Sequence, residues 1–127
     1  MCACDDRGVA TQVLIVDDHA SFRRLAGRVL ARAGFEVVGE AADAASAIRE
    51  AVVLQPDVVL LDVMLPDRSG LEVARELALS PSPPRVVLTS SRSRSDFGGA
   101  FEGIGGCEFI AKHQLSGPAL RALLQER

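Results

Sequence analysis

The run Val58-Val59-Leu60-Leu61-Asp62 decides the fold that this sequence predicts. Four apolar, strand-favouring residues without intervening polar ones are typical of a strand buried on both faces, as in a parallel sheet. The run ends abruptly at a carboxylate, and Pro66 and Gly70 follow shortly afterwards. A charge at the exit of a buried strand is either a helix cap or part of a functional site, and the rest of the chain indicates which.

Outward from this run, strands alternate with helices along the whole sequence. The other predicted strands are Gln12 to Val16, Phe35 to Ala41, Arg85 to Thr89 and Cys107 to Ala111. The predicted helices are about Ala20 to Ala33, Ala44 to Leu54, Leu71 to Leu79 and Asp96 to Ile104, with a last helix that begins near Pro118. This alternation implies an α/β fold, in which helices cover both faces of a five-stranded parallel sheet.

Length and composition limit the classes of function. The chain has 127 residues and is 48% hydrophobic, so we expect one folded domain over residues 12–127 after a flexible segment at residues 1–11. The net charge of −3 gives no basic footprint for nucleic acid or an anionic membrane. No apolar run approaches a membrane span, and the N-terminus lacks the apolar core of a signal peptide. We therefore expect a cytoplasmic protein.

The cysteines and histidines predict no disulfide framework and no thiolate metal site. The three cysteines are an odd and sparse set, and Cys2-Ala3-Cys4 has no second Cys/His pair with it. His19 and His113 stand alone in the sequence, and we expect His19 to face solvent.

Polar side chains follow four of the five predicted strands. Asp17 and Asp18 follow the first, Asp62 ends the third, Thr89 ends the fourth and Lys112 follows the fifth. Residues just past parallel strands gather at one edge of the sheet, where such folds bind ligands. Each residue alone has a plain structural explanation, such as a helix cap for the aspartates or a solvated lysine. Their joint placement at successive strand ends favours a site.

The residue types favour phosphoryl chemistry assisted by Mg²⁺. Clustered carboxylates repel one another unless a cation neutralises them, and hard oxygen ligands suit Mg²⁺. A carboxylate beside Mg²⁺ can attack phosphorus and form an aspartyl-phosphate. The metal, a lysine and a hydroxyl can then hold the phosphoryl oxygens.

The sequence resembles the receiver domain of bacterial two-component response regulators, which have a flavodoxin-like sheet in the order 2-1-3-4-5. The resemblance extends from about Gln12 to Leu124, and its motifs are Leu14-Ile15-Val16-Asp17-Asp18-His19, Val58 to Pro66, Gly70, Val87-Leu88-Thr89-Ser90 and Phe109-Ile110-Ala111-Lys112. It implies that Asp62 is the phosphoacceptor. It also implies that Asp18 binds Mg²⁺ directly, Asp17 mainly through water, and Met64 through its backbone carbonyl. Thr89 and Phe109 match the switch positions, and Lys112 matches the lysine that pairs with the phosphoryl group.

Two departures from the family pattern are informative. His113 stands where many receivers have Pro, so we expect the Lys112–His113 bond to be trans. Met64 stands two residues past the acceptor, at a position that influences phosphate lifetime in this family. We expect Met64 to be unable to position a hydrolytic water, so that the phosphorylated state is long-lived.

The resemblance implies a phosphoacceptor and not a multiple-turnover enzyme. A histidine kinase or a histidine phosphotransfer protein would donate the phosphoryl group. The sequence stops after the last helix, so we expect the output to be a protein contact or onward phosphate transfer. The contact would lie on the face formed by the helix near Asp96 to Ile104, the strand Cys107 to Ala111 and the last helix. We expect a monomer or weak dimer.

Three alternatives stay open at this point. One is a phosphate-independent interaction module with the same fold. Another is a small Mg²⁺-dependent aspartyl-phosphate phosphatase, although such enzymes usually have Asp where this chain has Met64. The third is a flavin-binding flavodoxin relative, which would need a phosphate-cradling loop and ring-stacking aromatics that the sequence lacks.

Overall fold

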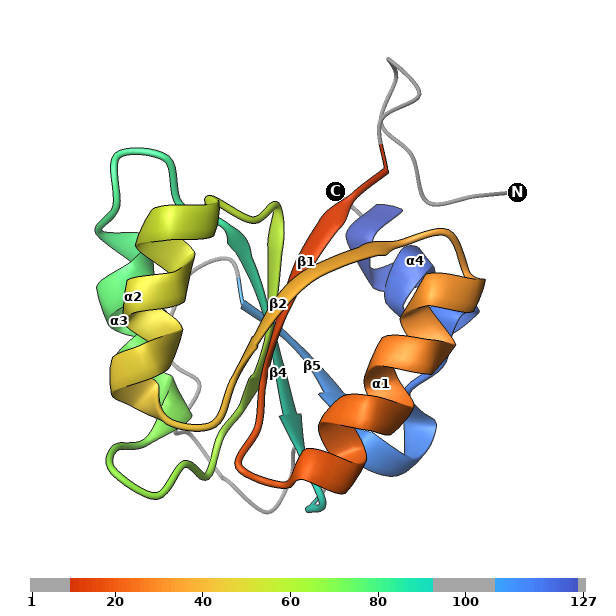
Figure 1. Cartoon of the computed structure of the whole chain (residues 1–127), viewed down its shortest axis with the longest axis horizontal. Coiled ribbons are helices and arrows are strands. Elements are labelled where there is room, and N and C mark those ends of the chain that lie inside the picture. The colour runs from red at the N-terminus through yellow and green to blue at the C-terminus, as the bar shows by residue number, and fades with distance from the viewer. Residues whose placement is uncertain (1–9, 93–106, 126–127) are drawn as a thin grey trace.

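The computed structural model describes residues 10–92 and 107–125, which form one parallel sheet covered by helices (Figure 1). The strand order is β2-β1-β3-β4-β5, and every neighbouring pair is parallel. The strands are β1 (Gln12–Val16), β2 (Glu36–Ala41), β3 (Val58–Asp62), β4 (Arg85–Ser90) and β5 (Cys107–Ala111). The predicted fold class and strand order are confirmed.

The helices lie in two pairs on opposite faces of this sheet (Figure 1). Their bounds are α1 (Ala20–Arg32), α2 (Ala44–Leu54), α3 (Gly70–Ala78) and α4 (Gly117–Gln125), and a short 3-10 turn, η2 (Lys112–Gln114), follows β5. Helices α2 and α3 cover one face, while α1 and α4 cover the other. The predicted helix from Asp96 to Ile104 and most of the predicted flexible segment at residues 1–11 lie outside the described residues.

The sheet separates two apolar clusters, one under each pair of helices. All five residues of β3 are buried, as the opening run predicts. Leu14, Val59 and Leu61 point to the α2/α3 side, whereas Ile15 and Leu60 point to the α1/α4 side. This alternation follows from the two-residue period of a strand. In β1, β3 and β4 it leaves only the strand ends free to carry polar side chains.

Local signals set the helix ends. The Asp43 side chain accepts a hydrogen bond from the backbone N–H of Ser46 and caps α2. Ser69 and Glu72 form a capping box at the start of α3. Gly34 follows α1 with a φ of 94°, a conformation that glycine adopts without strain. None of the peptide bonds in the described residues is cis, so the Lys112–His113 bond is trans, as expected.

Two residues that the helical period places inward are exposed. Leu25 on α1 is 51% exposed, and Ala78 at the end of α3 is also exposed. Helix α1 buries Ala26 and Leu30 fully, and Phe22 packs against the same cluster while partly exposed, so Leu25 lies at the solvent side of the apolar stripe.

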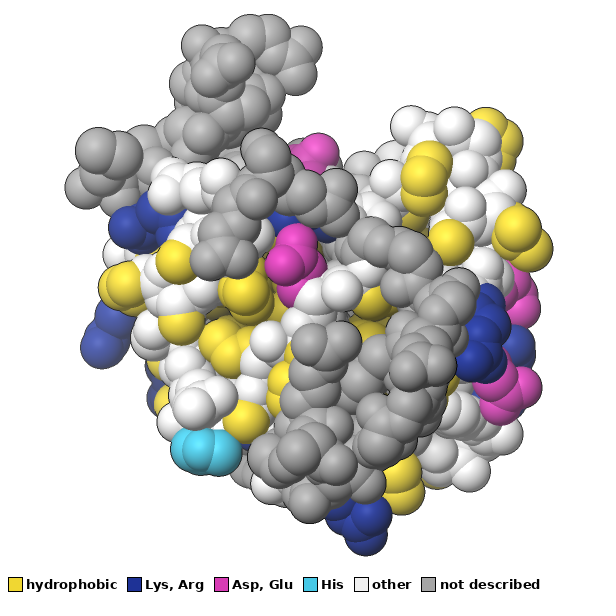
Figure 2. Space-filling model, turned by 180° about the vertical axis from the view of Figure 1, so that it is seen from behind, with side chains coloured by type: hydrophobic (Ala, Val, Ile, Leu, Met, Phe, Trp, Pro, Cys, Tyr) yellow, Lys and Arg dark blue, Asp and Glu magenta, His cyan; other side chains and the backbone are white. Residues whose placement is uncertain are grey.

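One face of the molecule carries charges of both signs. Acidic and basic side chains both occur on the face seen from behind, with apolar side chains between them (Figure 2). Among the described residues, no helix is long and apolar enough to cross a membrane.

Two close contacts fix α4 against the rest of the domain. Arg85, at the start of β4, donates to the carbonyl oxygens of Leu123 and Leu124 and pairs with Glu108. Its guanidinium therefore satisfies carbonyls at the C-terminal end of α4 that lack helical partners. At the other end of α4, a Cβ atom built on Gly117 would lie 2.2 Å from the Cβ of Ala33. A side chain at position 117 would therefore push α4 away from α1.

Gly117→Ala and Gly27→Ala form a matched pair that tests this close contact. Nothing lies within 4 Å of a Cβ built on Gly27, which sits inside α1. We expect Gly27→Ala to stabilise the chain by about 0.5–1 kcal/mol, because alanine is the better helix former. We expect Gly117→Ala to destabilise it by about 1–3 kcal/mol through the clash.

Urea unfolding followed by circular dichroism measures both changes, since the chain has no Trp or Tyr to report by fluorescence. Equal effects of the two substitutions would contradict the close approach of α4 to α1.

Candidate functional site

The predicted site residues meet at the edge where the parallel strands end. Asp17 and Asp18 directly follow β1, and Asp62 is the last residue of β3. Thr89 lies in β4 directly opposite Asp62 in the strand register. Lys112 follows β5, two strand positions away from β3 in the sheet.

Lys112 joins two of the carboxylates. Its Nζ atom lies 2.6 Å from Oδ2 of Asp17 and 3.2 Å from Oδ2 of Asp62. The contact with Asp62 is a hydrogen bond, whereas the contact with Asp17 is an ion pair without hydrogen-bond angles. The ring of Phe22 lies beneath the same ammonium group, 4.8 Å from its centroid to Nζ. One cation thus holds the ends of β1, β3 and β5 together.

The charges in this cluster do not balance. Asp17 is fully buried and Asp62 is 3% exposed, and Asp18 beside them adds a third carboxylate. Burial raises the pKa of Asp62 above its usual value, and repulsion from Asp17 adds to this, against the opposing effects of the Met64 N–H and Lys112. Burial opposes the charge on Lys112, but the contact with Asp17 and the attraction of both carboxylates raise its pKa overall. The site therefore favours additional positive charge.

The loop after Asp62 is held close to that residue. The backbone N–H of Met64 donates to Oδ1 of Asp62 at 3.0 Å, and Gly70 donates to the carbonyl of Val63 at 2.7 Å. A Cβ atom built on Gly70 would lie 2.1 Å from the carbonyl oxygen of Asp62, so position 70 requires glycine. The Met64 side chain points away from the core and is 59% exposed.

Thr89 lies in β4, the strand next to β3 and Asp62, and Phe109 lies in β5, the next strand of the sheet. Thr89 is fully buried, and its hydroxyl has no hydrogen-bond partner among the described residues. Such an unsatisfied group costs about 1–3 kcal/mol. Phe109 in β5 is partly buried and packs against the apolar cluster under α2 and α3. The hydroxyl of Thr89 is therefore available to a new partner at the strand end.

The donor atoms of the acidic cluster suit a divalent cation. One ligand atom each from Asp17, Asp18, His19 and Asp62 all lie within 4.8 Å of one another. Three of these ligands are carboxylate oxygens, which hard cations such as Mg²⁺ prefer. The three predicted carboxylates therefore suit a hard divalent cation such as Mg²⁺ in kind.

Two neighbours of the site were not predicted as part of it. His19 is exposed, as expected, yet its Nδ1 lies 3.1 Å from both Oδ1 of Asp17 and Oδ1 of Asp18. Phe22 falls on the apolar face of the predicted helix Ala20 to Ala33, which indicates only that it packs inward. Both residues are near Asp17 and Asp18 in the sequence, at the start of the helix that follows them. Their proximity could have suggested a role, but the direction of each side chain could not be read from the sequence.

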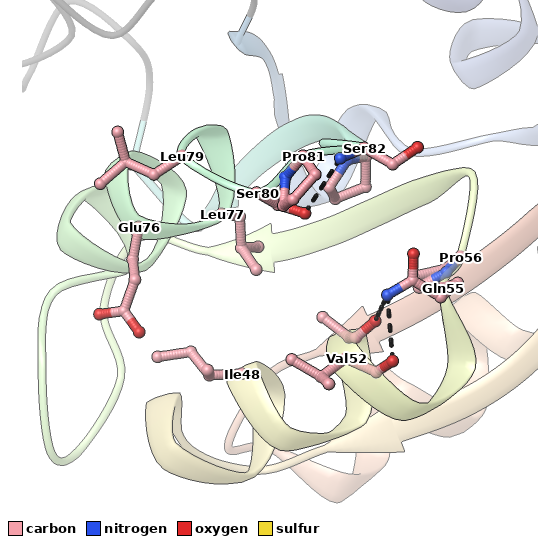
Figure 3. Close-up of a pocket in the computed structure, with 12 residues that line it drawn as sticks. Ile48, Val52, Gln55, Pro56, Glu76, Leu77, Leu79, Ser80, Pro81 and Ser82 are labelled. Atoms are coloured by element: carbon pink, nitrogen blue, oxygen red, sulfur yellow. Dashed lines mark hydrogen bonds between the residues drawn. The ribbon is translucent and has the colours of Figure 1, made fainter.

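A separate cavity of about 320 Å³ lies between α2 and α3 (Figure 3). Apolar side chains such as Ile48, Val52 and Leu77 line it, and none of the predicted site residues does. Among the described residues that line it, only Glu76 is ionisable, and its carboxylate pairs with Arg68 at 3.2 Å. This cavity therefore offers no group for the chemistry that the acidic cluster suggests.

Comparison with known proteins points to one family. A family model described as the response regulator receiver domain matches residues 13–125. The chain is 39% identical over 89 residues to the transcriptional regulatory protein PdtaR of Mycobacterium tuberculosis, a match that covers 70% of this chain. It is 47% identical over 81 residues, or 63% of its length, to a protein-glutamate methylesterase/protein-glutamine glutaminase of Myxococcus xanthus.

A solved structure agrees in fold. A two-component response regulator of the LuxR family from Aurantimonas superimposes with a TM-score of 0.81 at 28% identity, covering 93% of this chain and 87% of that one. The matched regions make up 43% of the PdtaR chain and 23% of the Myxococcus protein, so this chain spans less than half the length of these relatives.

Two substitutions, one that removes a negative charge and one that removes a positive charge, test whether the cluster has excess negative charge. Asp62→Asn removes a buried charge but keeps the side-chain shape, so we expect it to stabilise the chain at neutral pH in the presence of a chelator. This gain should shrink as the pH falls through the raised pKa of Asp62, because the protonated carboxyl carries no charge. Lys112→Met leaves the carboxylates unpaired and should destabilise the chain by about 2 kcal/mol or more.

Urea unfolding between pH 7.5 and pH 4 measures both effects. A loss of stability in Asp62→Asn at neutral pH would contradict the charge imbalance.

Proposed function

The chain belongs to the response regulator receiver domain family, and we propose on this premise that Asp62 accepts a phosphoryl group from a histidine kinase or a histidine phosphotransfer protein. The observation that carries the proposal is the position of the Lys112 ammonium between the buried carboxylates of Asp17 and Asp62. An aspartate at the end of a central strand, with a cation beside it, has a partner ready for the oxygens of an incoming phosphoryl group.

The proposed reaction transfers one phosphoryl group without further reagents. A carboxylate oxygen of Asp62 attacks phosphorus and forms a new O–P bond, while the P–N bond to the donor imidazole breaks. The imidazole leaves with the electron pair and is protonated by solvent. Such transfer depends mainly on positioning and on charge stabilisation, which the fixed ammonium of Lys112 supplies.

Mg²⁺ fits the oxygen ligands of this site, and it would neutralise charge on the phosphoryl oxygens when bound. Asp18 and Asp62 would hold it directly, with the backbone carbonyl of Met64 as a third protein ligand and Asp17 acting through water. The imbalance of three carboxylates against one ammonium supports this assignment, because a divalent cation would relieve their repulsion.

Thr89 and Phe109 would carry the signal to the surface. The buried Thr89 hydroxyl, without a partner among the described residues, gains a strong acceptor when Asp62 bears a phosphoryl group. Phe109 would then follow into the space that Thr89 leaves. We propose that this population shift changes the surface near β5 and α4, and that the partner protein reads it there.

Met64 makes a phosphatase the weaker reading of the same pocket. A hydrolase that works through an aspartyl-phosphate needs an acid or base near its leaving group. The side chain two residues past Asp62 is an exposed thioether, which can neither donate nor accept a proton in that role. Slow loss of phosphate is expected, without turnover of a substrate.

Phosphorylation of Asp62 can be tested with a small phosphodonor such as acetyl phosphate, with Mg²⁺, by intact-protein mass spectrometry. We expect a gain of one phosphoryl group in the parent chain and none in Asp62→Asn. Asp57→Asn is a matched control, because Asp57 is exposed and precedes the opposite end of the same strand. A gain that persists in Asp62→Asn would sink the assignment of the acceptor.

The lifetime of the phosphorylated form tests the role of Met64. We expect Met64→Asn to shorten it by about tenfold, because an amide can hold a water near phosphorus and a thioether cannot. Val52→Asn is a control, since Val52 is also an exposed apolar side chain but lies on α2. The decay of the phosphorylated mass after removal of the donor measures the rate. An unchanged rate in Met64→Asn would show that position 64 does not control the lifetime.

A further inference from the structure

His19 directly follows the two aspartates and precedes helix α1, but its side chain does not cap that helix. It is the N-cap residue of α1, with an extended backbone at φ −92° and ψ 108°, yet its side chain makes no capping hydrogen bond. Instead, its Nδ1 atom lies 3.1 Å from Oδ1 of Asp17 and 3.1 Å from Oδ1 of Asp18. The imidazole is therefore directed at the acidic cluster.

The two oxygens of Asp17 face different neighbours. Oδ2 lies against the ammonium of Lys112, whereas Oδ1 lies toward His19. The Lys112 side of the cluster is buried, since the Lys112 side chain is 16% exposed, while the His19 side chain is 65% exposed. The Asp17 side chain is fully buried, whereas the Asp18 side chain is 36% exposed. A cation that enters from solvent therefore first meets Asp18, whose Oδ1 lies 3.1 Å from the imidazole nitrogen.

The spacing of these atoms fits neighbouring positions around one metal ion. Metal–ligand bonds of about 2.1 Å in octahedral geometry place adjacent ligands about 3.0 Å apart and opposite ligands about 4.2 Å apart. The separation of 3.1 Å between Nδ1 and Oδ1 of Asp18 agrees with adjacent ligands, while Asp17, at the same distance from Nδ1, is the carboxylate that would act through a bound water. The limit of 4.8 Å across the whole set of Asp17, Asp18, His19 and Asp62 exceeds the opposite-ligand distance by about half an ångström, which small side-chain rotations can close.

We propose that His19 is a nitrogen ligand of the cation site, so that the site binds borderline divalent cations such as Ni²⁺ and Zn²⁺ more tightly than its carboxylates alone would. Imidazole suits these ions, whereas Mg²⁺ prefers oxygen. In the ligand form Nδ1 carries no proton, and the ring proton is on Nε2. The proposal rests on the proposed function, because it uses the same carboxylates, and it adds that the identity of the bound ion depends on an exposed histidine.

A simpler role for His19 makes a different prediction. An imidazole that only donates a hydrogen bond would orient Asp17 and Asp18 for any cation, and its loss would weaken Mg²⁺ and Ni²⁺ binding alike. His19→Asn keeps a side-chain N–H donor but removes the imidazole nitrogen that binds borderline ions. His19→Ala removes both. Comparing the two variants with both ions therefore separates a ligand from a positioning residue.

The test is isothermal titration of the full chain with NiCl₂ and, separately, with MgCl₂. All variants carry Cys2→Ser and Cys4→Ser, because thiolates bind the same borderline ions. We expect His19→Asn and His19→Ala each to weaken Ni²⁺ binding by about tenfold or more, and Mg²⁺ binding by less than about twofold. His113→Ala is the matched control, since His113 is the other histidine of the chain and is exposed, and it should change neither affinity.

Two results would overturn the proposal: equal weakening of both ions, or Ni²⁺ binding that His19 substitutions leave unchanged. Either one would leave the proposed function intact as long as the parent chain binds Mg²⁺ and gains a phosphoryl group on Asp62. A parent chain that binds neither ion would overturn both, because the carboxylates would then form no cation site.

Discussion

The whole site depends on one ammonium group placed among buried carboxylates. Lys112 lies within 3.2 Å of both Asp17 and Asp62, and its side chain reaches them from the end of a different strand. Because the carboxylates are buried, water cannot screen their repulsion, and the lysine alone does not balance their charge. The domain thus keeps a local excess of negative charge, which a bound cation would neutralise.

The sheet makes this arrangement possible. The strands that carry Asp17 and Asp62 are neighbours, and β4 lies between Asp62 and the strand that leads to Lys112. The apolar residues of β1, β3 and β4 fill both clusters, so polar groups in these three strands occur only at the strand ends. Two glycines then allow the close contacts that keep these ends in place. Gly70 lets the loop fold back onto Asp62, and Gly117 lets α4 approach α1.

Most of the fold and much of the site could be predicted from the sequence, since both follow from patterns along the chain. Buried runs and turn residues located the strands, and the polar residues at the strand ends located Asp17, Asp62 and Lys112. What could not be predicted depends on side-chain direction. Leu25 fits the helical period but lies outside the contact that α1 makes, and His19 is exposed yet turned toward the aspartates. Neither result follows from residue spacing, because spacing fixes the face of a helix but not its packing partner or a rotamer.

Burial determines which residues of the cluster can be replaced without loss of stability. A substitution at Lys112 leaves the buried carboxylates of Asp17 and Asp62 without their cation, so stability restricts that position. His19 reaches the same carboxylates from solvent, so its replacement costs the fold little. If His19 is a ligand, its replacement would change the preference of the site for one cation over another without unfolding the domain. The buried charges would then define where a cation binds, and exposed neighbours such as His19 would determine which cation binds most tightly.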